Sequence, residues 1–291
     1  MNGVPFAKGQ ALGNDYLVVD AAELPWPMTP ARARAFCDRH YGAGSDGVLV
    51  GYLDEDPIRL QIFNPDGSEA EKSGNGLRIF AAYLFGRGVV THEPFQVRLA
   101  RDQVTMQVET ADRDGVLQVV VDIGRPSFRG ESVGFRPVQG EALGVELELE
   151  GGETAVVNVV SLGNPHCVVF VDELRRDDFL RRAPQLVGHP AFAHGTNVQF
   201  ARIAGPDRIE AWIYERGVGE TLASGSSASA VAAAALRLGL VESRELTVEM
   251  RGGEVRIEAG DDGALRLRGP AQIVYTGHIT PGAAAAWGRL D

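Results

Sequence analysis

Residues 61–84, QIFNPDGSEAEKSGNGLRIFAAYL, and residues 212–236, WIYERGVGETLASGSSASAVAAAAL, decide the fold because they share one order of elements. Each begins with a strand-like run, continues through a glycine-rich turn to a small polar residue, and ends in an apolar helix pattern. Ser73-Gly74 in the first stretch corresponds to Ser224-Gly225 in the second, at an offset of 151 residues. This correspondence indicates an internal duplication.

Three further matches lie in the same order along the chain. Gly13-Asn14 corresponds to Gly163-Asn164 at an offset of 150, and the stretches starting at residues 44 and 62 correspond to those at 195 and 213. Each match alone is weak, but four in one order at nearly one offset predict two homologous halves related by a pseudo-two-fold axis. We place these halves at residues 1–125 and 126–278, and leave open whether residues 279–291 complete the first half.

Local patterns predict strands and one outer helix. Thr29-Pro30 combines an N-cap residue with proline at the first helical position, which predicts a helix to about His40. Apolar residues in residues 97–108 and 116–123 predict two antiparallel strands. The turn between these strands contains Asp112, Asp114 and Gly115.

Two helices are predicted to be buried because apolar residues cover most of their circumference. The first spans residues 77–84, and the second spans residues 228–238 and ends at Gly239. The predicted fold class is therefore α+β, with two pseudo-symmetric domains. In each domain strands surround one buried helix.

Composition limits the classes of function. The 291 residues are 44% hydrophobic and 23% charged, which is typical of a soluble globular protein with two domains. No apolar run approaches the roughly 20 residues of a membrane span, and the N-terminal pattern is not that of a signal peptide. A net charge of −11 without a basic stripe disfavours nucleic-acid binding. Two cysteines and six scattered histidines predict neither disulfides nor a metal site. We expect a cytoplasmic protein that binds a small molecule.

The starts of the two buried helices predict an anion site. A helix N-terminus offers free N–H groups and a partial positive charge, which suit a carboxylate or a phosphate. Two such ends facing each other across a cleft between the halves would bind one ligand from both sides. The alternative is that Ser73 and Ser224 are ordinary N-cap residues.

The motifs GNDY, IFNPDGSEAEKSGNG, GNPHCVVFV, GTNVQF and YERGVGETLASGS together resemble the diaminopimelate epimerase family over nearly the whole chain. The resemblance implies two pseudo-symmetric domains, each a barrel-like, mostly antiparallel sheet around a buried central helix. It further implies an active site between these domains and a homodimer. It also implies conversion of LL- to meso-diaminopimelate in lysine biosynthesis, without a cofactor or metal. In this family one thiolate removes the α-proton, and a thiol on the opposite face returns a proton.

The resemblance also implies individual roles for site residues. The substrate α-carboxylate would be bound by the N–H groups of Gly74, Asn75, Gly225 and Ser226. The distal carboxylate would be bound by Asn64, Asn164, Asn197 and Arg216. Glu215 would accept a hydrogen bond from the α-ammonium and, with His166, modulate acid and base strength, while Asn14 would complete the polar lining. The alternatives are Asx turns for the asparagines and a solvated ion pair for Glu215-Arg216.

Ser73 and Ser224 stand where the family has its catalytic cysteines. A thiol titrates near about 8.5, and lower at a helix N-terminus, whereas a serine hydroxyl requires a neighbouring base. A lesser departure is Gly47, where the family usually has glutamine. We therefore predict binding of a diaminopimelate-like amino acid with impaired or altered turnover.

Three explanations for the serines remain open: a substitution that traps substrate, a natural paralogue with different proton-transfer chemistry, and a binding module without catalysis. Ser229, also at a position where close relatives often have cysteine, favours natural drift. A serine hydrolase is a further alternative, although neither Ser73 nor Ser224 lies in G-x-S-x-G. Residues 42–47 fit a dinucleotide motif literally but follow a predicted helix and precede a strand, which disfavours that class.

Overall fold

The computed structural model describes residues 3–112 and 114–290, which form two units. Unit 1 contains the described residues up to Val121 together with those from Gly269 onward, and unit 2 is Asp122–Arg268. The sequence analysis placed the corresponding boundaries at 125/126 and 278/279. Two strands, β7 (Leu117–Gly124) and β16 (Leu265–Ile279), continue across the boundaries.

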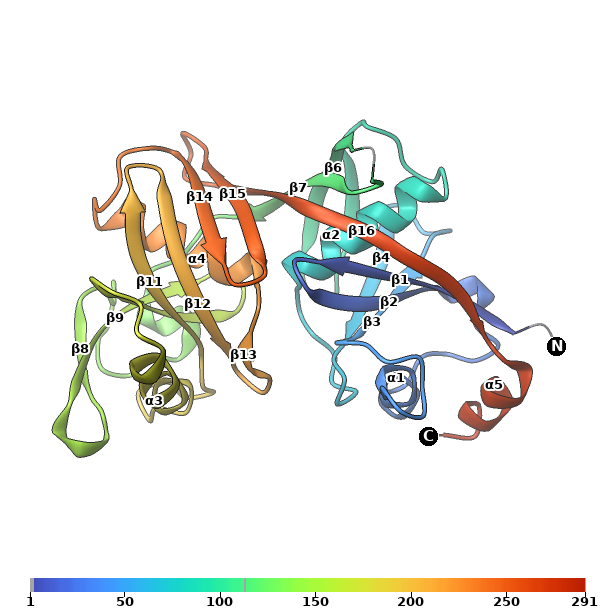
Figure 1. Ribbon diagram of the computed structural model, residues 1–291, viewed down its shortest axis with the longest axis horizontal. Helices are drawn as coiled ribbons and strands as arrows, with labels where there is room; N and C mark the ends of the chain where they lie inside the picture. Colours follow the sequence, from blue (N-terminus) through green and yellow to red (C-terminus); the bar gives the residue numbers. More distant parts are fainter. Residues whose placement is uncertain (1–2, 113, 291) are drawn as a thin grey trace. The chain divides into compact units, whose positions relative to one another are not determined.

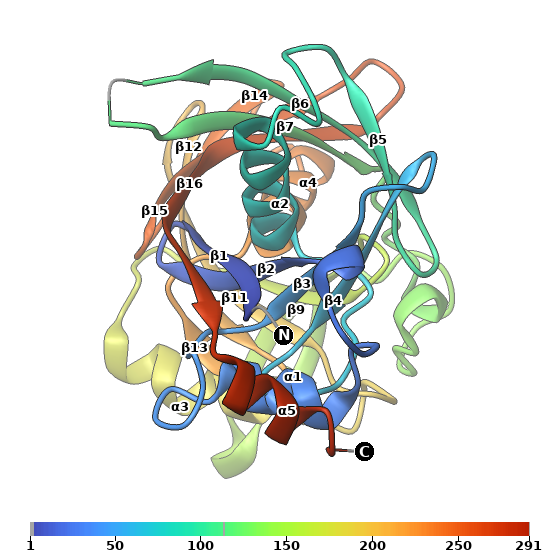
Figure 2. The ribbon, with the colours of Figure 1, turned by 90° about the vertical axis from the view of Figure 1, so that its right-hand side faces the viewer.

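Unit 1 is a closed ring of strands around one helix, α2 (Gly74–Gly86), as Figures 1 and 2 show. Its other strands are β1 (Val4–Ala11), β2 (Asn14–Asp20), β3 (Val48–Tyr52), β4 (Ile58–Phe63), β5 (Phe95–Arg98) and β6 (Gln103–Ala111). They pair in chain order to β7, which pairs with β16, and β16 returns to β1. The pairs β2–β3 and β4–β5 are parallel.

Unit 2 likewise has strands around an inner helix, α4 (Gly225–Arg237) (Figure 1). Its strands are β8 (Val145–Glu148), β9 (Thr154–Ser161), β10 (Pro165–Phe170), β11 (Asn197–Gly205), β12 (Arg208–Glu215), β13 (Gly219–Thr221), β14 (Glu245–Met250) and β15 (Gly253–Ala259). The order from β16 is β15, β14, β12, β11, β10, β9, β8, and β13 pairs with β12. The pairs β10–β11 and β12–β14 are parallel, as are the corresponding pairs of unit 1.

The inner helices are buried because their sequences are apolar on nearly every side. In α2 every residue from Gly74 to Leu84 is buried, and Ile79 packs where Gly9 of β1 lacks a side chain. Alanine predominates in α4, so this helix lies close to the surrounding strands. The structure therefore confirms both predicted buried helices, and Gly239 follows α4 with a left-handed φ of 68°.

Outer helices cover part of each sheet. In unit 1, α1 (Pro30–Cys37) and α5 (Pro281–Trp287) pack together, with the Phe36 and Trp287 ring centroids 4.8 Å apart. In unit 2, the Phe179 ring of α3 (Arg176–Val187) makes edge contacts with Phe200 and Trp212. Short 3-10 helices are Ala21–Glu23, Gly130–Val133 and Glu150–Gly152. The predicted fold class, two similar α+β domains, is confirmed.

Two local predictions were wrong. The helix from Thr29 ends at Cys37 rather than near His40, because the Asp38 carboxylate accepts the N–H groups of His40 and Tyr41 at 2.7 Å. The expected single strand over 97–108 is interrupted between β5 and β6, where the Leu99 N–H donates to the Asp102 carbonyl at 2.7 Å. In both places a local turn replaces a regular element.

Candidate active site

The Ser73 hydroxyl lies at the N-terminus of α2 and has two neighbours. Its Oγ accepts a hydrogen bond from the Gly76 N–H at 3.0 Å, so Ser73 is an N-cap residue. Its Oγ also lies 3.2 Å from the Tyr16 hydroxyl oxygen, and either group can donate. The hydroxyl is therefore held at the helix start by one backbone group and one side chain.

The first turn of α2 is fixed by a fully buried arginine, Arg78. Its guanidinium donates to Asn75 Oδ1 at 2.8 Å, to the Gly74 carbonyl at 3.1 Å and to the Pro270 carbonyl at 3.2 Å. These acceptors are neutral, and burial lowers the pKa of Arg78 to about 9, so the side chain is charged at neutral pH. A buried positive charge thus lies directly beneath the predicted carboxylate-binding turn.

Two predicted asparagines of unit 1 differ in their surroundings. Asn14 belongs to the α2 N-terminus, because its Oδ1 accepts from Asn75 Nδ2 at 3.2 Å and its Nδ2 donates to Asp46 at 2.9 Å. Asn64 forms a local turn, where its backbone and side-chain N–H groups donate to Ser68 O and Ser68 Oγ at 2.8 and 3.0 Å. Asn64 thus lies in a local turn, but its side chain donates to Ser68 Oγ and does not make the backbone contact of an Asx turn.

The α4 N-terminus has weaker contacts. Within the described part of the chain, the buried Ser224 hydroxyl makes no side-chain cap to α4, and its Oγ lies 3.5 Å from Ser226 Oγ. Asn164 Nδ2 donates to the same Ser226 oxygen at 3.5 Å. Ser224 is thus less constrained by hydrogen bonds than Ser73.

His166 anchors Asn164 from inside unit 2. Its ring is fully buried, with Nε2 3.0 Å from Asn164 Oδ1 and Nδ1 3.1 Å from Gln199 Nε2. Burial, with the charge of Arg216, lowers the pKa of His166 to about 3. Because the Gln199 amide donates to Nδ1, we assign the proton to Nε2, which donates to Asn164. His166 is therefore a neutral group that orients Asn164.

Asn197 and Arg216 meet where β11 begins and β12 ends. Asn197 Oδ1 accepts from the Arg216 backbone N–H at 3.0 Å, while the Arg216 guanidinium donates to the His194 carbonyl at 2.7 Å. Gly195 has a left-handed φ of 68°, and a Cβ there would lie 3.2 Å from Arg216 Cδ. Glu215 precedes Arg216 at the end of β12, so these three predicted residues are neighbours.

The predicted residues thus form local groups within the units. Unit 1 brings together Asn14, Ser73, Gly74 and Asn75, with Asn64 in a separate turn. Unit 2 brings together two groups: Asn164, His166, Ser224, Gly225 and Ser226 in one, and Asn197, Glu215 and Arg216 in the other.

Sequence reasoning missed three side chains that contact these groups: Tyr16, Arg78 and Gln199. The repeat contained a signal for the first, because Tyr16 follows Asn14 by two positions just as His166 follows Asn164. Arg78 was hidden inside an apolar helix, and Gln199 was hidden inside a buried strand. Buried polar residues in apolar segments are the general signal for such roles.

Neither native cysteine replaces the family's thiols. Cys37 lies in α1, and burial raises the pKa of its thiol to about 11. Burial also raises the pKa of the Cys167 thiol, which faces the core of unit 2. Both groups are therefore protonated at neutral pH and have little nucleophilic character.

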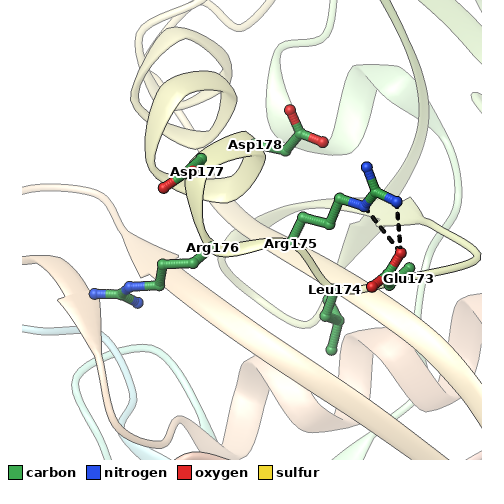
Figure 3. Close-up of a pocket in the computed structure, with 6 residues that line it drawn as sticks. All are labelled: Glu173, Leu174, Arg175, Arg176, Asp177 and Asp178. Carbon is green, nitrogen blue, oxygen red and sulfur yellow. Dashed lines mark hydrogen bonds and ion pairs between the residues drawn. The ribbon is translucent and has the colours of Figure 1, made fainter.

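A pocket in unit 2 lies outside these groups. Figure 3 shows its lining, the continuous segment from Glu173 to Asp178, in which Arg175 points toward Glu173 and pairs with it at 2.8 Å. It contains none of the predicted site residues. Across residues 3–112 and 114–290, no cluster of three His, Cys, Asp or Glu side chains is placed to hold a metal. The same ranges include no helix long and apolar enough to span a membrane.

Comparisons with known proteins agree with the motifs. A family model described as diaminopimelate epimerase matches residues 6–129 and 158–277. Diaminopimelate epimerase 2 of Nostoc sp. is 42% identical over 88% of this chain and 89% of its own length. The diaminopimelate epimerase of Desulfitobacterium hafniense is 38% identical, over 93% and 96% respectively.

Solved structures share the fold at low sequence identity. A hydroxyproline epimerase from Agrobacterium vitis with bound trans-4-hydroxy-L-proline has a TM-score of 0.71 at 15% identity, covering 99% of both chains. A PhzF-family phenazine biosynthesis protein from Bacillus anthracis has a TM-score of 0.68 at 16% identity, covering 96% of this chain and 99% of its own. These likenesses concern the fold alone.

Proposed function

Because the chain belongs to the diaminopimelate epimerase family, we propose that it is a cofactor-independent isomerase acting at the α-carbon of an amino acid, either diaminopimelate or a related substrate. The observation that carries this proposal is the duplicated arrangement of Ser73 and Ser224, each at the start of the buried helix of its unit. The names of the curated relatives support the choice of substrate. A homodimer and a cytoplasmic location remain predictions.

Substrate binding would use both helix starts. The N–H groups of Gly74, Asn75, Gly225 and Ser226 would bind the α-carboxylate, since first-turn N–H groups have no acceptor within the helix. Asn64, Asn164, Asn197 and Arg216 would bind the distal carboxylate, and arginine adds a charge-assisted hydrogen bond. Glu215 would accept from the α-ammonium, and Asn14 would complete the lining.

Proton transfer would use the two hydroxyls. One serine, as its alkoxide, would remove the α-proton and leave the electron pair on the α-carbon. The hydroxyl of the other serine would deliver its proton to the opposite face and become the alkoxide. A serine hydroxyl is a weak base without an activating partner. We therefore expect turnover to be slower than with thiols, or to depend on a partner group.

Two alternatives differ in their support. A binding paralogue without catalysis is favoured by the serines themselves. A serine hydrolase is disfavoured by the contacts of His166, because its ring nitrogens lie beside Asn164 and Gln199 rather than beside a serine hydroxyl. Covalent labelling of either serine by a fluorophosphonate would favour the serine hydrolase instead.

The test combines binding with isotope exchange. Isothermal titration should detect meso-diaminopimelate binding to the native chain, and the S73C/S224C variant should exchange the substrate α-proton in D₂O about 100-fold faster or more. The S132C variant, at an exposed serine, is the control for an added thiol. Absence of binding to both the native chain and the double variant, together with absence of exchange, would contradict the proposal.

A further inference from the structure

We propose that Tyr16 is the proton-transfer partner of Ser73, giving unit 1 the titratable group that a serine alone lacks. This inference rests on the proposed function and assigns Tyr16 a role through Ser73. Tyr16 is a positioning and relay residue rather than a group that contacts the α-carbon. Its counterpart in the repeat, His166, instead forms a hydrogen bond with Asn164.

The geometry supports direct proton exchange between the two hydroxyls. The Tyr16 and Ser73 oxygens are 3.2 Å apart, and the Gly76 N–H occupies one acceptor direction on Ser73 Oγ at 3.0 Å. Tyr16 is 6% exposed and Ser73 is half-buried, so their contact lies partly out of solvent. In such an environment a hydrogen bond between hydroxyls is stronger than it is in water.

Gly47 makes room for this contact. A Cβ at Gly47 would lie 2.5 Å from Cε1 and 2.9 Å from Cδ1 of the Tyr16 ring, and 2.6 Å from the Phe63 carbonyl oxygen. Any larger residue at position 47 would therefore displace the ring from its present position. The two departures of unit 1 from the family pattern, Ser73 and Gly47, both contact Tyr16. Both departures therefore act on the position of the same side chain.

The proton transfer at Ser73 balances when Tyr16 starts as a phenolate, its phenolic proton having passed to solvent. A phenol ordinarily titrates near about 10 and is far more acidic than an alcohol. As Ser73 Oγ takes the substrate α-proton, its own hydroxyl proton passes to the Tyr16 phenolate. The Cα–H bond breaks with its electron pair left on the α-carbon, a new Ser73 O–H bond forms, and Tyr16 becomes neutral. The reverse sequence delivers a proton from Tyr16 through Ser73.

The charges on the adjoining elements are paired with one another. Asp15 follows Asn14 on β2 and pairs with Lys8 of β1 at 2.6 Å. Arg39 pairs with Asp15 at 2.9 Å and with Asp46, the residue before Gly47, at 2.8 Å. These ion pairs balance the two positive and two negative charges of these four residues.

The decisive experiment is a double-mutant cycle between Tyr16 and Ser73. Y16F removes a single oxygen, and Y52F is the matched control because the Tyr52 hydroxyl donates to Gln61 elsewhere in unit 1. In the native background Y16F should lower kcat for diaminopimelate α-proton exchange about 100-fold, with the Kd from titration calorimetry nearly unchanged. In the S73C background, where the thiolate needs no partner, Y16F should lower kcat less than about 3-fold. G47A should reproduce the Y16F loss.

Other results of these measurements would overturn either the Tyr16 relay or the proposed function. An equal loss in both backgrounds, or no loss in the native one, would show that Tyr16 has a structural role and would overturn the relay. Exchange by S73C/S224C without any exchange by the native chain, which still binds substrate, would overturn the relay and leave the proposed function standing. Neither binding nor exchange by either form would overturn the proposed function itself. Circular dichroism melting of Y16F checks that the fold is intact.

Discussion

The N-termini of α2 and α4 occupy corresponding places in the two units but are held in different ways. At α2, Ser73 caps the helix and contacts Tyr16, and the fully buried Arg78 binds the first turn from within. At α4, Ser224 contacts Ser226 at 3.5 Å, and the residue matching Arg78 is Ser229, which donates to the Gly225 carbonyl at 2.9 Å. One helix start is tightly bound, and the other is weakly bound.

The difference teaches that duplication has kept the backbone while the polar side chains diverged. The parallel pairs β2–β3 and β10–β11 match, and so do the buried helices that follow them. The partner of each serine, however, differs: Tyr16 contacts Ser73, whereas Ser226 contacts Ser224. The two halves of the proposed site are therefore chemically unequal.

The largest expected effect is on stability, from removal of the buried arginine. R78A should lower the free energy of unfolding by about 3–5 kcal/mol, because it leaves a cavity and deprives three acceptors of their donor. S229A removes one hydrogen bond and should lower the free energy of unfolding by about 1 kcal/mol. Urea denaturation measures both.

R237A is the control, because Arg237 is a half-exposed partner of Glu141 and its removal should change stability by less than about 1 kcal/mol. Equal losses for R78A and S229A would contradict the view that the two helix starts are held with different strength.

The next expected effect is on the pH dependence of stability, to which His166 contributes. Its pKa is lowered to about 3 in the folded chain, whereas an unfolded histidine titrates near about 6.5. Below pH 6.5 the unfolded state therefore binds a proton that the folded state does not, and stability falls as the pH is lowered toward 3. At pH 5 this loss should be about 2 kcal/mol.

Urea denaturation of the native chain and H166N at pH 7 and pH 5 measures this contribution, which the variant should lack. H278N, at an exposed position, should keep it. Parallel pH profiles for the native chain and H166N would mean that His166 is not held neutral.

The smallest expected effect is a difference in epimerisation rate between two single-cysteine variants, one at each helix start. S224C keeps the Ser73–Tyr16 contact beside one thiol, whereas S73C keeps the weakly bound Ser224. S224C should therefore epimerise diaminopimelate about 10-fold faster than S73C, a difference of about 1.4 kcal/mol in barrier. Chiral chromatography of the product measures inversion, and the reverse order of rates would contradict the asymmetry.

The sequence predicted those features that depend on long apolar patterns. The two buried helices and the duplication follow from residues 77–84, residues 228–238 and four aligned motifs. The break between β5 and β6 could not be predicted, because the apolar alternation resumes after a turn of four residues. The early end of α1 depends on one Asp38 side chain competing for backbone N–H groups.

The site was predicted in outline but not in its supporting contacts. The glycine-rich turns and serines are visible as motifs, whereas the roles of Tyr16 and Arg78 arise from contacts between distant segments. Tyr16 meets Ser73 across 57 positions, and Arg78 meets the Pro270 carbonyl across 192. Pairing of distant segments is determined by the whole fold, so local patterns contain little information about it.

Strand β16 has a consequence for biosynthesis. Its residues from Gly269 onward close the ring of unit 1 against β1 and β7, and Pro270 accepts from Arg78 inside that ring. A ribosome completes all of unit 2 before it makes this closing segment. Until this segment is made, the first half of the chain therefore has two open sheet edges and lacks the Pro270 acceptor of Arg78, and during this interval the nascent chain is exposed to aggregation.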